Sequence, residues 1–269
     1  MSPSGWLGAT LVAIVVVTAA AAPLLATYDP AAIDVAHRFA APGVAHWLGT
    51  DQAGRDIYSR LVFGTRVAMA IALSTIALAL TIGGALGIAA AFAKGWTERV
   101  ILWVFDVNAA FPGLILALAV VAVYGPSGLN LVLVMAASMV PQFGRVARAQ
   151  ALALKSAPFL EVERILGAGP LRIVVHHVLP NIAGPLIVLA SMDIPVVIAV
   201  EAGLSFIGLS VRPPLASWGT LINDGYAFLS DTTWPVLTAA AALSIATLGF
   251  TLLGEALQEA LDPRRRPRA

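Results

Sequence analysis

Long apolar runs are the feature of this sequence that most limits what it can fold into. A helix that crosses a bilayer needs about 20 largely apolar residues. Six stretches reach or approach that length, at residues 6–26, 67–92, 100–124, 129–143, 178–202 and 234–253. The fourth is short and is expected to continue beyond Arg145, and the sixth to continue toward Ala260. The pattern predicts an all-α fold with about six helices.

Composition indicates that these helices lie in a membrane. Of the 269 residues, 59% are hydrophobic and only 12% are charged, about half the charged fraction of a soluble domain. A soluble monomer exposes much of its surface to water, so it could not hide this much apolar surface. We therefore expect a multi-pass integral membrane protein.

Composition also excludes several kinds of site. The chain has no Cys, which rules out disulfides, thiolate nucleophiles and Cys-ligated metals. Four His leave few ways to build a metal site; His176 and His177 are adjacent and point apart on a helix, so we expect no metal. A net charge of +1 gives no overall field that would attract nucleic acid.

The distribution of Lys and Arg between the loops predicts the orientation. With both termini cytoplasmic, eleven of these residues lie inside and five outside. The inside set is Lys94, Arg99, Arg145, Arg148, Lys155, Arg164, Arg172, Arg264, Arg265, Arg266 and Arg268, and the outside set is Arg38, Arg55, Arg60, Arg66 and Arg212. We therefore predict that both termini are cytoplasmic, although residues 1–5 carry no Lys or Arg.

The first apolar run has two interpretations, a secretory signal peptide or a retained helix. A signal peptide has a basic start and a shorter apolar region. Residues 1–5 lack a basic side chain and the run that follows is long, so we expect a retained first transmembrane helix.

The inner segment at residues 144–177 is unusually long for a connection between adjacent helices. Pro158 suits the first turn of a helix, and Phe159, Val162 and Leu166 would share one face of it. Gly167 and Pro170 would end that helix before a second short one begins. Such an amphipathic helix could lie on the lipid surface or insert its apolar face into a groove of a soluble partner.

The same segment carries a resemblance to a known family. Its stretch Glu161-Val-Glu163-Arg-Ile-Leu-Gly167, with Leu179-Pro180-Asn181 further on, is similar to the Glu-Ala-Ala loop of ABC importer permeases. Val162 and Glu163 depart from the two alanines of that motif, whereas Gly167 and the Leu-Pro-Asn end match. The resemblance implies that the loop couples the permease to an ATPase. The residues it assigns to coupling are Phe159, Leu160, Glu161, Val162, Glu163, Arg164, Leu166, Gly167 and Ala168.

Three further blocks narrow the resemblance to dipeptide and oligopeptide permeases of the peptide/nickel type, C-type subunit. They are residues 48–60, residues 201–219 and the Leu261-Asp262-Pro263-Arg264 end. The family fold is that of a type I ABC importer permease with cytoplasmic coupling helices. The resemblance implies import of di- or oligopeptides across the cytoplasmic membrane by alternating access, with nickel or another small solute as the alternative.

The resemblance also implies partners that this chain must work with. These are a second homologous permease, two ATP-binding subunits, an extracytoplasmic substrate-binding protein and membrane lipid. A P-loop needs Gly-x-x-x-x-Gly-Lys-Ser/Thr, and neither Lys94 nor Lys155 stands in that context. We therefore expect a permease rather than an enzyme, with no cofactor on this chain and with ATP and Mg on the ATPase subunits.

The sequence also suggests a division of the chain. Residues 1–64 would form the first helix and an extracytoplasmic segment. Residues 65–258 would form the permease domain, and residues 259–269 a basic cytoplasmic tail.

Polar residues inside apolar spans are candidates for function. Asp106 is expected near the inner interface, whereas Asp193 lies deeper and could line a path or pair with an Arg. The resemblance places Glu201 at the outer gate. Further structural or gate candidates are Pro180, Asn181, Asp193 and Trp218, and no family role carries over to Asp193. The outer stretch 201–233 would fold back into the mouth, or would be an ordinary loop anchored by Trp218 and Trp234.

Other classes of membrane protein fit the sequence less well. An ion-coupled secondary transporter could use Asp106, Asp193 or Glu255 as a relay, but it needs no long inner loop. An intramembrane serine protease using Ser205 would need a His in a later span, and all four His precede Ser205. A receptor anchor without transport would not explain three ordered blocks of resemblance.

Overall fold

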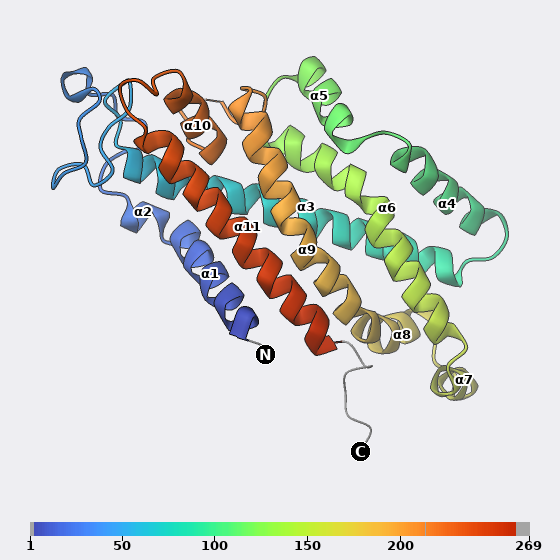
Figure 1. The fold of residues 1–269 in the computed structure, drawn as a ribbon. Coiled ribbons are helices and arrows are strands. Elements are labelled where there is room, and N and C mark those ends of the chain that lie inside the picture. The colour runs from blue at the N-terminus through green and yellow to red at the C-terminus, as the bar shows by residue number, and fades with distance from the viewer. Residues whose placement is uncertain (1–2, 213, 262–269) are drawn as a thin grey trace.

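The computed structural model describes residues 3–212 and 214–261, and in that part of the chain the regular structure is helical (Figure 1). The elements are α1 (Pro3–Ala20), α2 (Ala22–Leu25), η1 (Val35–His37), α3 (Ile57–Phe92), α4 (Trp96–Ala109), α5 (Gly113–Tyr124), α6 (Gly128–Lys155), α7 (Pro158–Ile165), α8 (Pro170–Ile173), the π-helical turn η2 (Val174–Val178), α9 (Leu179–Phe206), α10 (Trp218–Tyr226) and α11 (Trp234–Leu261). The predicted all-α membrane fold is confirmed.

Five helices are long and apolar enough to cross a membrane: α1, α3, α6, the α8–η2–α9 run and α11. The predicted third span, 100–124, is wrong as one continuous helix. It is divided into α4 and α5, which bend by 79° at the break between them. Pro112 lies in this break and has no N–H with which to continue an α-helical ladder.

Helix α3 begins ten residues before the predicted second span, so the predicted outer segment is shorter than expected. Asp56 caps the new start, because its side chain accepts a hydrogen bond from the Ser59 N–H at 2.8 Å. The boundary predicted between residues 64 and 65 therefore falls inside one continuous helix.

The inner segment is also shorter than predicted. Helix α6 continues through the first twelve residues of the expected loop, 144–177, and ends at Lys155. The ammonium of Lys155 donates to the carbonyl of Ala91 at 2.7 Å and lies 5.7 Å from the ring centroid of Phe92. Lys155 thus joins the end of α6 to the last turn of α3.

Helices α3 and α6 cross at very short range. A Cβ atom added at Gly87 would stand 2.1 Å from the Gly144 carbonyl oxygen, and one at Gly83 would stand 2.6 Å from the Val140 carbonyl oxygen. Small residues four apart allow helix backbones to approach closely in lipid. This crossing is the central contact of the bundle.

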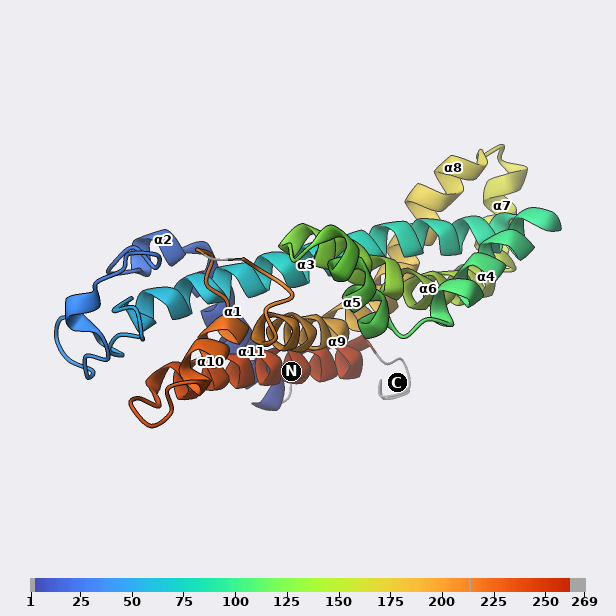
Figure 2. The same cartoon turned by 90° about the horizontal axis from the view of Figure 1, so that it is seen from above.

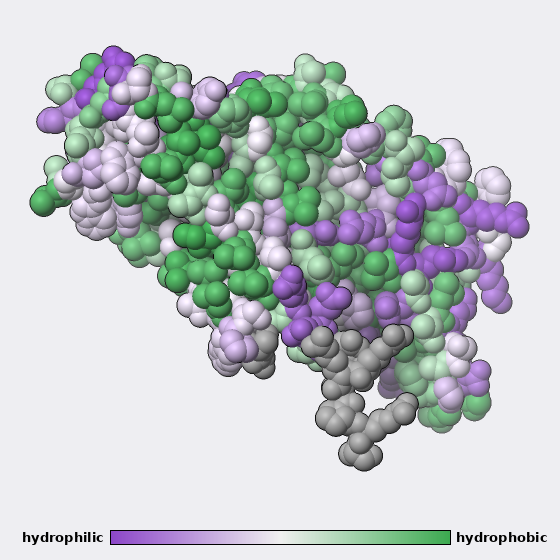
Figure 3. All heavy atoms as spheres, viewed as in Figure 1, coloured by the Kyte–Doolittle hydropathy of each residue, from purple (hydrophilic) through white to green (hydrophobic). Residues whose placement is uncertain are grey.

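The two ends of the bundle differ in what they carry. One end of the bundle carries the start of α1, the end of α11 and helix α7. The opposite end carries α10 and the segment before α3 (Figures 1 and 2). Hydrophobic side chains cover the face that carries α1, and hydrophilic ones gather where α4 lies beside α6 (Figure 3). The first three residues of the predicted basic tail, 259–261, belong to α11, while residues 262–269, which include Asp262-Pro263-Arg264 of the C-terminal block, lie outside the described residues.

Candidate functional site

Helix α7 has the start and the end that the sequence predicts. Pro158 is its first residue and Gly167 follows it with φ +85. The Gly167 N–H donates to the Arg164 carbonyl at 3.0 Å and the Ala168 N–H donates to the Glu163 carbonyl at 2.9 Å. This pair of bonds is the Schellman arrangement, which needs a residue that tolerates positive φ.

Helix α7 is anchored to the core by Leu160, and two further contacts join it to His177. Leu160 is fully buried in the hydrophobic core. Phe159 stacks against His177 with ring centroids 6.2 Å apart, and the Glu163 carboxylate lies 3.6 Å from Nε2 of His177. Glu163, which departs from the alanine of the family motif, therefore has a partner at the start of the next long helix.

Four further large apolar side chains of this region are exposed, and one of them, Leu171, also borders the space beside α3. Val162, Ile165, Leu166 and Leu171 form what we call the exposed apolar face; Ile165 is 84% exposed and Leu166 75%. The sequence prediction included Val162 and Leu166 but missed Ile165 and Leu171. The spacing of Ile165, three residues after Val162, was the signal for it. Leu171 follows the break at Pro170, so no helical period connects it to the others.

A π-helical turn joins α8 to α9. The Leu179 N–H donates to the carbonyl of Val174, five residues back, instead of following the α-helical pattern. The next residue, Pro180, has no N–H, and the Asn181 side-chain amide donates to the carbonyl of His177 at 2.6 Å. The predicted candidates Pro180 and Asn181 thus lie at an irregular joint, and such π turns are frequent at functional sites.

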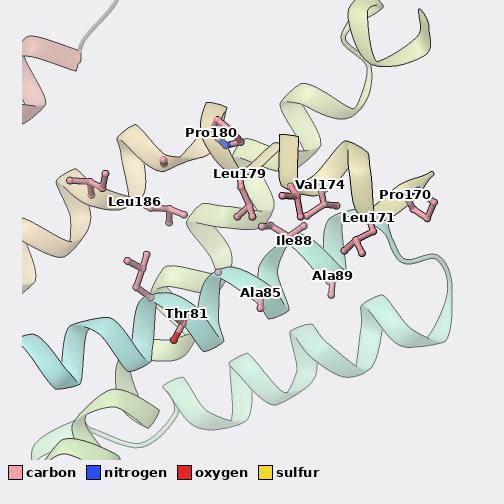
Figure 4. A pocket seen from close by; sticks show the side chains of 15 residues that line it. Thr81, Ala85, Ile88, Ala89, Pro170, Leu171, Val174, Leu179, Pro180 and Leu186 are labelled. Atoms are coloured by element: carbon pink, nitrogen blue, oxygen red, sulfur yellow. The ribbon is translucent and has the colours of Figure 1, made fainter. Parts of the chain in front are cut away.

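A groove of about 1000 Å³ separates this joint from α3 (Figure 4). Thr81, Ala85 and Ile88 line one wall from α3, while Leu171 and Leu179 line the other from α8 and α9. The lining is almost wholly apolar. The α8–η2 arm is therefore not tightly packed against α3 at this end.

The opposite end of the bundle holds a cluster of four charged side chains, which we call the four-charge cluster. It contains Asp51, Arg55, Arg60 and Asp224. Arg55 Nε lies 2.8 Å from Asp51, Arg60 forms an ion pair with the same carboxylate, and Nη2 of Arg60 lies 2.8 Å from Asp224. Asp51 and Arg60 are buried. The cluster joins the segment before α3 to α10, more than 160 residues later in the chain.

The stretch after α9 folds back over the bundle. A capping box formed by Ser217 and Thr220 starts α10. Trp218 is buried against Gly64 of α3, and its indole N–H donates to the Leu61 carbonyl at 3.4 Å. Trp218 is therefore not a membrane-interface anchor, and the ordinary-loop interpretation of this stretch is wrong.

Glu201 lies fully buried beneath this cover. Its carboxylate accepts hydrogen bonds from Ser205 Oγ at 2.6 Å and from Ser210 Oγ at 3.3 Å. These bonds join the last turns of α9 to the segment that leads toward α10, so Glu201 fixes the turn from which the cover begins.

The two intramembrane aspartates have different surroundings. Asp106 is largely exposed and lies 2.8 Å from Arg145 on α6. Asp193 is buried, and its neighbour is the Gln142 side chain rather than an Arg among the described residues. The alternative in which Asp193 pairs with an Arg is therefore not found in the part of the chain that the structure describes.

Comparison with known proteins gives concordant results. A family model described as "Binding-protein-dependent transport system inner membrane component" matches residues 83–267. A dipeptide transport system permease protein of Alkalihalophilus pseudofirmus is 34% identical over 257 residues, which are 96% of this chain and 84% of that protein. A glutathione transport system permease protein of Pectobacterium atrosepticum is 38% identical over 223 residues, 83% of this chain and 74% of that protein.

A third relative and a solved structure agree with these. A probable D,D-dipeptide transport system permease protein of Escherichia coli K12 is 34% identical over 263 residues, 98% of this chain and 88% of that protein. A chain of the MetNI methionine ABC transporter, solved in inward-facing conformations, matches with a TM-score of 0.58 and 18% identity. The match covers 76% of this chain and 96% of that one.

Proposed function

This chain belongs to the family of binding-protein-dependent transport system inner membrane components, and on that premise we propose that it passes di- or oligopeptides through an ATP-driven importer. The predicted resemblance and the predicted permease fold are confirmed. The observation that carries the substrate class is that relatives covering most of the chain are named for dipeptide, D,D-dipeptide and glutathione transport. All three substrates are short peptides.

Helix α7 is the docking element for an ATPase subunit in this proposal. The exposed apolar face supports it, because its α7 side chains, Val162, Ile165 and Leu166, lie outside the spans and would otherwise be left exposed. An amphipathic helix that inserts such a face into a groove is a common mode of recognition. Its buried residue, Leu160, faces the protein, and Glu161 and Arg164 lie on the exposed surface of the same helix.

A movement of α7 would then be transmitted to the membrane-spanning helices through the π-helical turn η2. Gly167 and the π turn interrupt the regular backbone between α7 and α9. The groove beside α3 leaves one side of the α8–η2 arm free to shift, while Ile173 and Val178 join the arm to the hydrophobic core. Because the arm continues directly into α9, a shift at α7 would tilt that helix and so contribute to alternating access.

The orientation follows from the same assignment. Helix α7, the start of α1 and the end of α11 would lie on the cytoplasmic side, where the loops are richer in Lys and Arg. The four-charge cluster and α10 would lie outside, at the mouth that receives substrate from a binding protein. Two ATPase subunits carrying ATP and Mg, and a second homologous permease, would complete the transporter.

Uptake by the complete reconstituted complex tests this function. Labelled dipeptides, longer peptides and nickel are offered to proteoliposomes with and without ATP. We expect ATP-dependent accumulation of peptide and no accumulation of nickel. Nickel uptake without peptide uptake would replace the proposed substrate, and uptake that persists without ATP but follows an ion gradient would refute ATP-driven import.

A further inference from the structure

A carboxyl group lies halfway through the membrane-spanning part of this chain. Asp193 stands near the midpoint of α9 (Leu179–Phe206), and Gln142 stands near the midpoint of α6 (Gly128–Lys155). The two side chains are hydrogen-bonding neighbours. Only 8% of the Asp193 residue surface is exposed, and its Oδ2 has no hydrogen-bond partner among the described residues.

This environment differs from that of the structural aspartates. Asp51 pairs with two arginines, and Asp56 accepts hydrogen bonds from the Ser59 N–H and contacts His46. Asp193 has no Lys or Arg partner in the described part of the chain. A buried polar atom without a partner destabilises a fold by about 1–3 kcal/mol. Oε2 of Glu201 also has no partner among the described residues, but Glu201 lies in the last two turns of α9, whereas Asp193 lies at its midpoint, where a transported ligand would pass.

Gln142 connects the buried carboxyl to the surface of the molecule. Its own side chain is exposed, as is that of Arg145, which lies one turn further along α6. Hydrophilic side chains gather over this part of α6 and α4 (Figure 3). Because polar side chains at membrane depth face water or protein rather than lipid, this face of α6 lies toward a solvated path or a neighbouring subunit.

The chemistry of the missing ligand follows from the acceptor. A carboxylate oxygen can only accept hydrogen bonds. A ligand that balances the negative charge of a carboxylate must itself be positively charged. A primary ammonium supplies both the donors and the charge, and transporter sites of this kind lie near the bilayer midplane. A short peptide with a free amino terminus carries such a group.

From this geometry we infer that Asp193, together with Gln142, is the mid-membrane contact for the α-ammonium group of the transported peptide. The inference rests on the proposed peptide import and names a specificity-determining residue for it. Asp193 is covered in this conformation, so the contact forms when α6 and α9 move relative to each other during transport.

A pair of substrates that differ only in this charge tests the inference. The complete complex, with its binding protein saturated, takes up a labelled dipeptide or the same dipeptide acetylated at its amino terminus. Wild type should favour the free amine, and Asp193→Asn should reduce that preference by roughly tenfold or more, since a hydrogen bond to a charged group contributes about 1.5–3 kcal/mol. Asp193→Glu should keep the preference.

Two further variants make the result decisive. Ser191→Ala is the matched control, because Ser191 is a buried polar residue of the same helix that bonds only locally, to the Val188 carbonyl at 2.7 Å; it should leave the preference unchanged. If Asp193→Asn does not fold, Gln142→Ala replaces it, because that side chain is exposed, and it should reduce the preference in the same direction.

The outcomes separate this inference from the proposed function. Wild type that takes up both dipeptides equally, or a preference that survives both Asp193→Asn and Gln142→Ala, overturns the ammonium contact and leaves peptide import standing. Wild type that takes up neither dipeptide overturns peptide import itself, and the contact with it.

Discussion

At the end of the bundle that the proposed orientation makes the outer one, two arginines and two aspartates neutralise one another. At the proposed inner end α7 is held by the buried Leu160, by the ring contact of Phe159 with His177, and by the 3.6 Å approach of Glu163 to His177. The outer end also buries its large aromatic side chain, Trp218, while the inner end exposes Ile165 and Leu166. The charges of the four-charge cluster are balanced within this chain, although Val44 and Trp47 at the same end are exposed. The inner end leaves the apolar side chains of Ile165 and Leu166 exposed, which is the surface that the proposed docking to an ATPase subunit would cover.

The largest expected effect comes from breaking the four-charge cluster. Arg60→Leu would leave Asp51 and Asp224 with too little positive charge, and loss of one partner from a buried pair destabilises by about 3–5 kcal/mol. We expect a large fall in thermal stability of the purified complex. Arg145→Leu is the matched control, because its pair with Asp106 is 50% and 72% exposed at the two side chains, and such pairs contribute about 0–1 kcal/mol. Equal destabilisation by the two variants would refute the assigned role of the cluster.

The exposed apolar face should behave in the opposite way. Ile165→Ser combined with Leu166→Ser removes side chains that contact little within this chain, so stability should change by about 0.5 kcal/mol or less. Transport and co-purification of the ATPase subunits should fall at least tenfold if each side chain contributes about 1 kcal/mol or more to docking. Val44→Ser, at an almost fully exposed position of the outer segment, should leave ATPase co-purification unchanged. Full co-purification in the double variant would contradict docking through α7.

Two glycines with the same backbone geometry sharpen the comparison. Gly167 has φ +85 and Gly208 has φ +77, and a Cβ atom at either position would meet nothing within 4 Å. A β-branched residue is strained at positive φ by about 1–3 kcal/mol, so Gly167→Val and Gly208→Val should carry similar local costs. Only Gly167→Val should lower transport several-fold relative to ATP hydrolysis, with the protein still in the membrane. Normal transport in Gly167→Val would show that the bend at Gly167 is not needed to couple α7 to the membrane-spanning helices.

The smallest effect is expected at the Glu163–His177 pair. Both side chains are partly exposed and 3.6 Å apart, so their interaction should contribute about 0.5 kcal/mol. A double-mutant cycle with Glu163→Gln and His177→Asn, read out as transport per ATP hydrolysed, measures the coupling between them. Strictly additive effects would show that α7 transmits motion through Leu160 and the backbone alone.

Much of the fold could be predicted because local residues determine it. The apolar runs located the five long helices but not the break that divides the run at 100–124, and Pro158 with Gly167 gave the limits of α7 within two residues. The apolar run becomes uninterrupted only after Arg60 and Arg66, so the early start of α3 was missed at residues 57–66. They are helical because Asp51 and Asp224 neutralise Arg60, and Asp224 is 164 residues away in the sequence.

The candidate site shows the same division between local and distant causes. The exposure of Val162 and Leu166 follows from the helical period, so it was predictable. The contact of Glu163 with His177 depends on how α7 folds back onto η2, and the burial of Trp218 depends on Gly64 in another helix. Neither contact can be predicted from a short stretch of sequence, because each depends on how two separate elements pack together.

The length of α3 has a consequence for the lipid around the transporter. Its 36 residues span about 54 Å at 1.5 Å per residue, well beyond a hydrocarbon core of about 30 Å. Arg60 holds one end to α10 and the Ala91 carbonyl holds the other to Lys155. The distance between the end of the bundle that carries α10 and the end that carries Lys155 is therefore set by a rigid helix and not by bilayer thickness. Membranes of shorter or longer acyl chains should change the tilt of the bundle while leaving that separation constant.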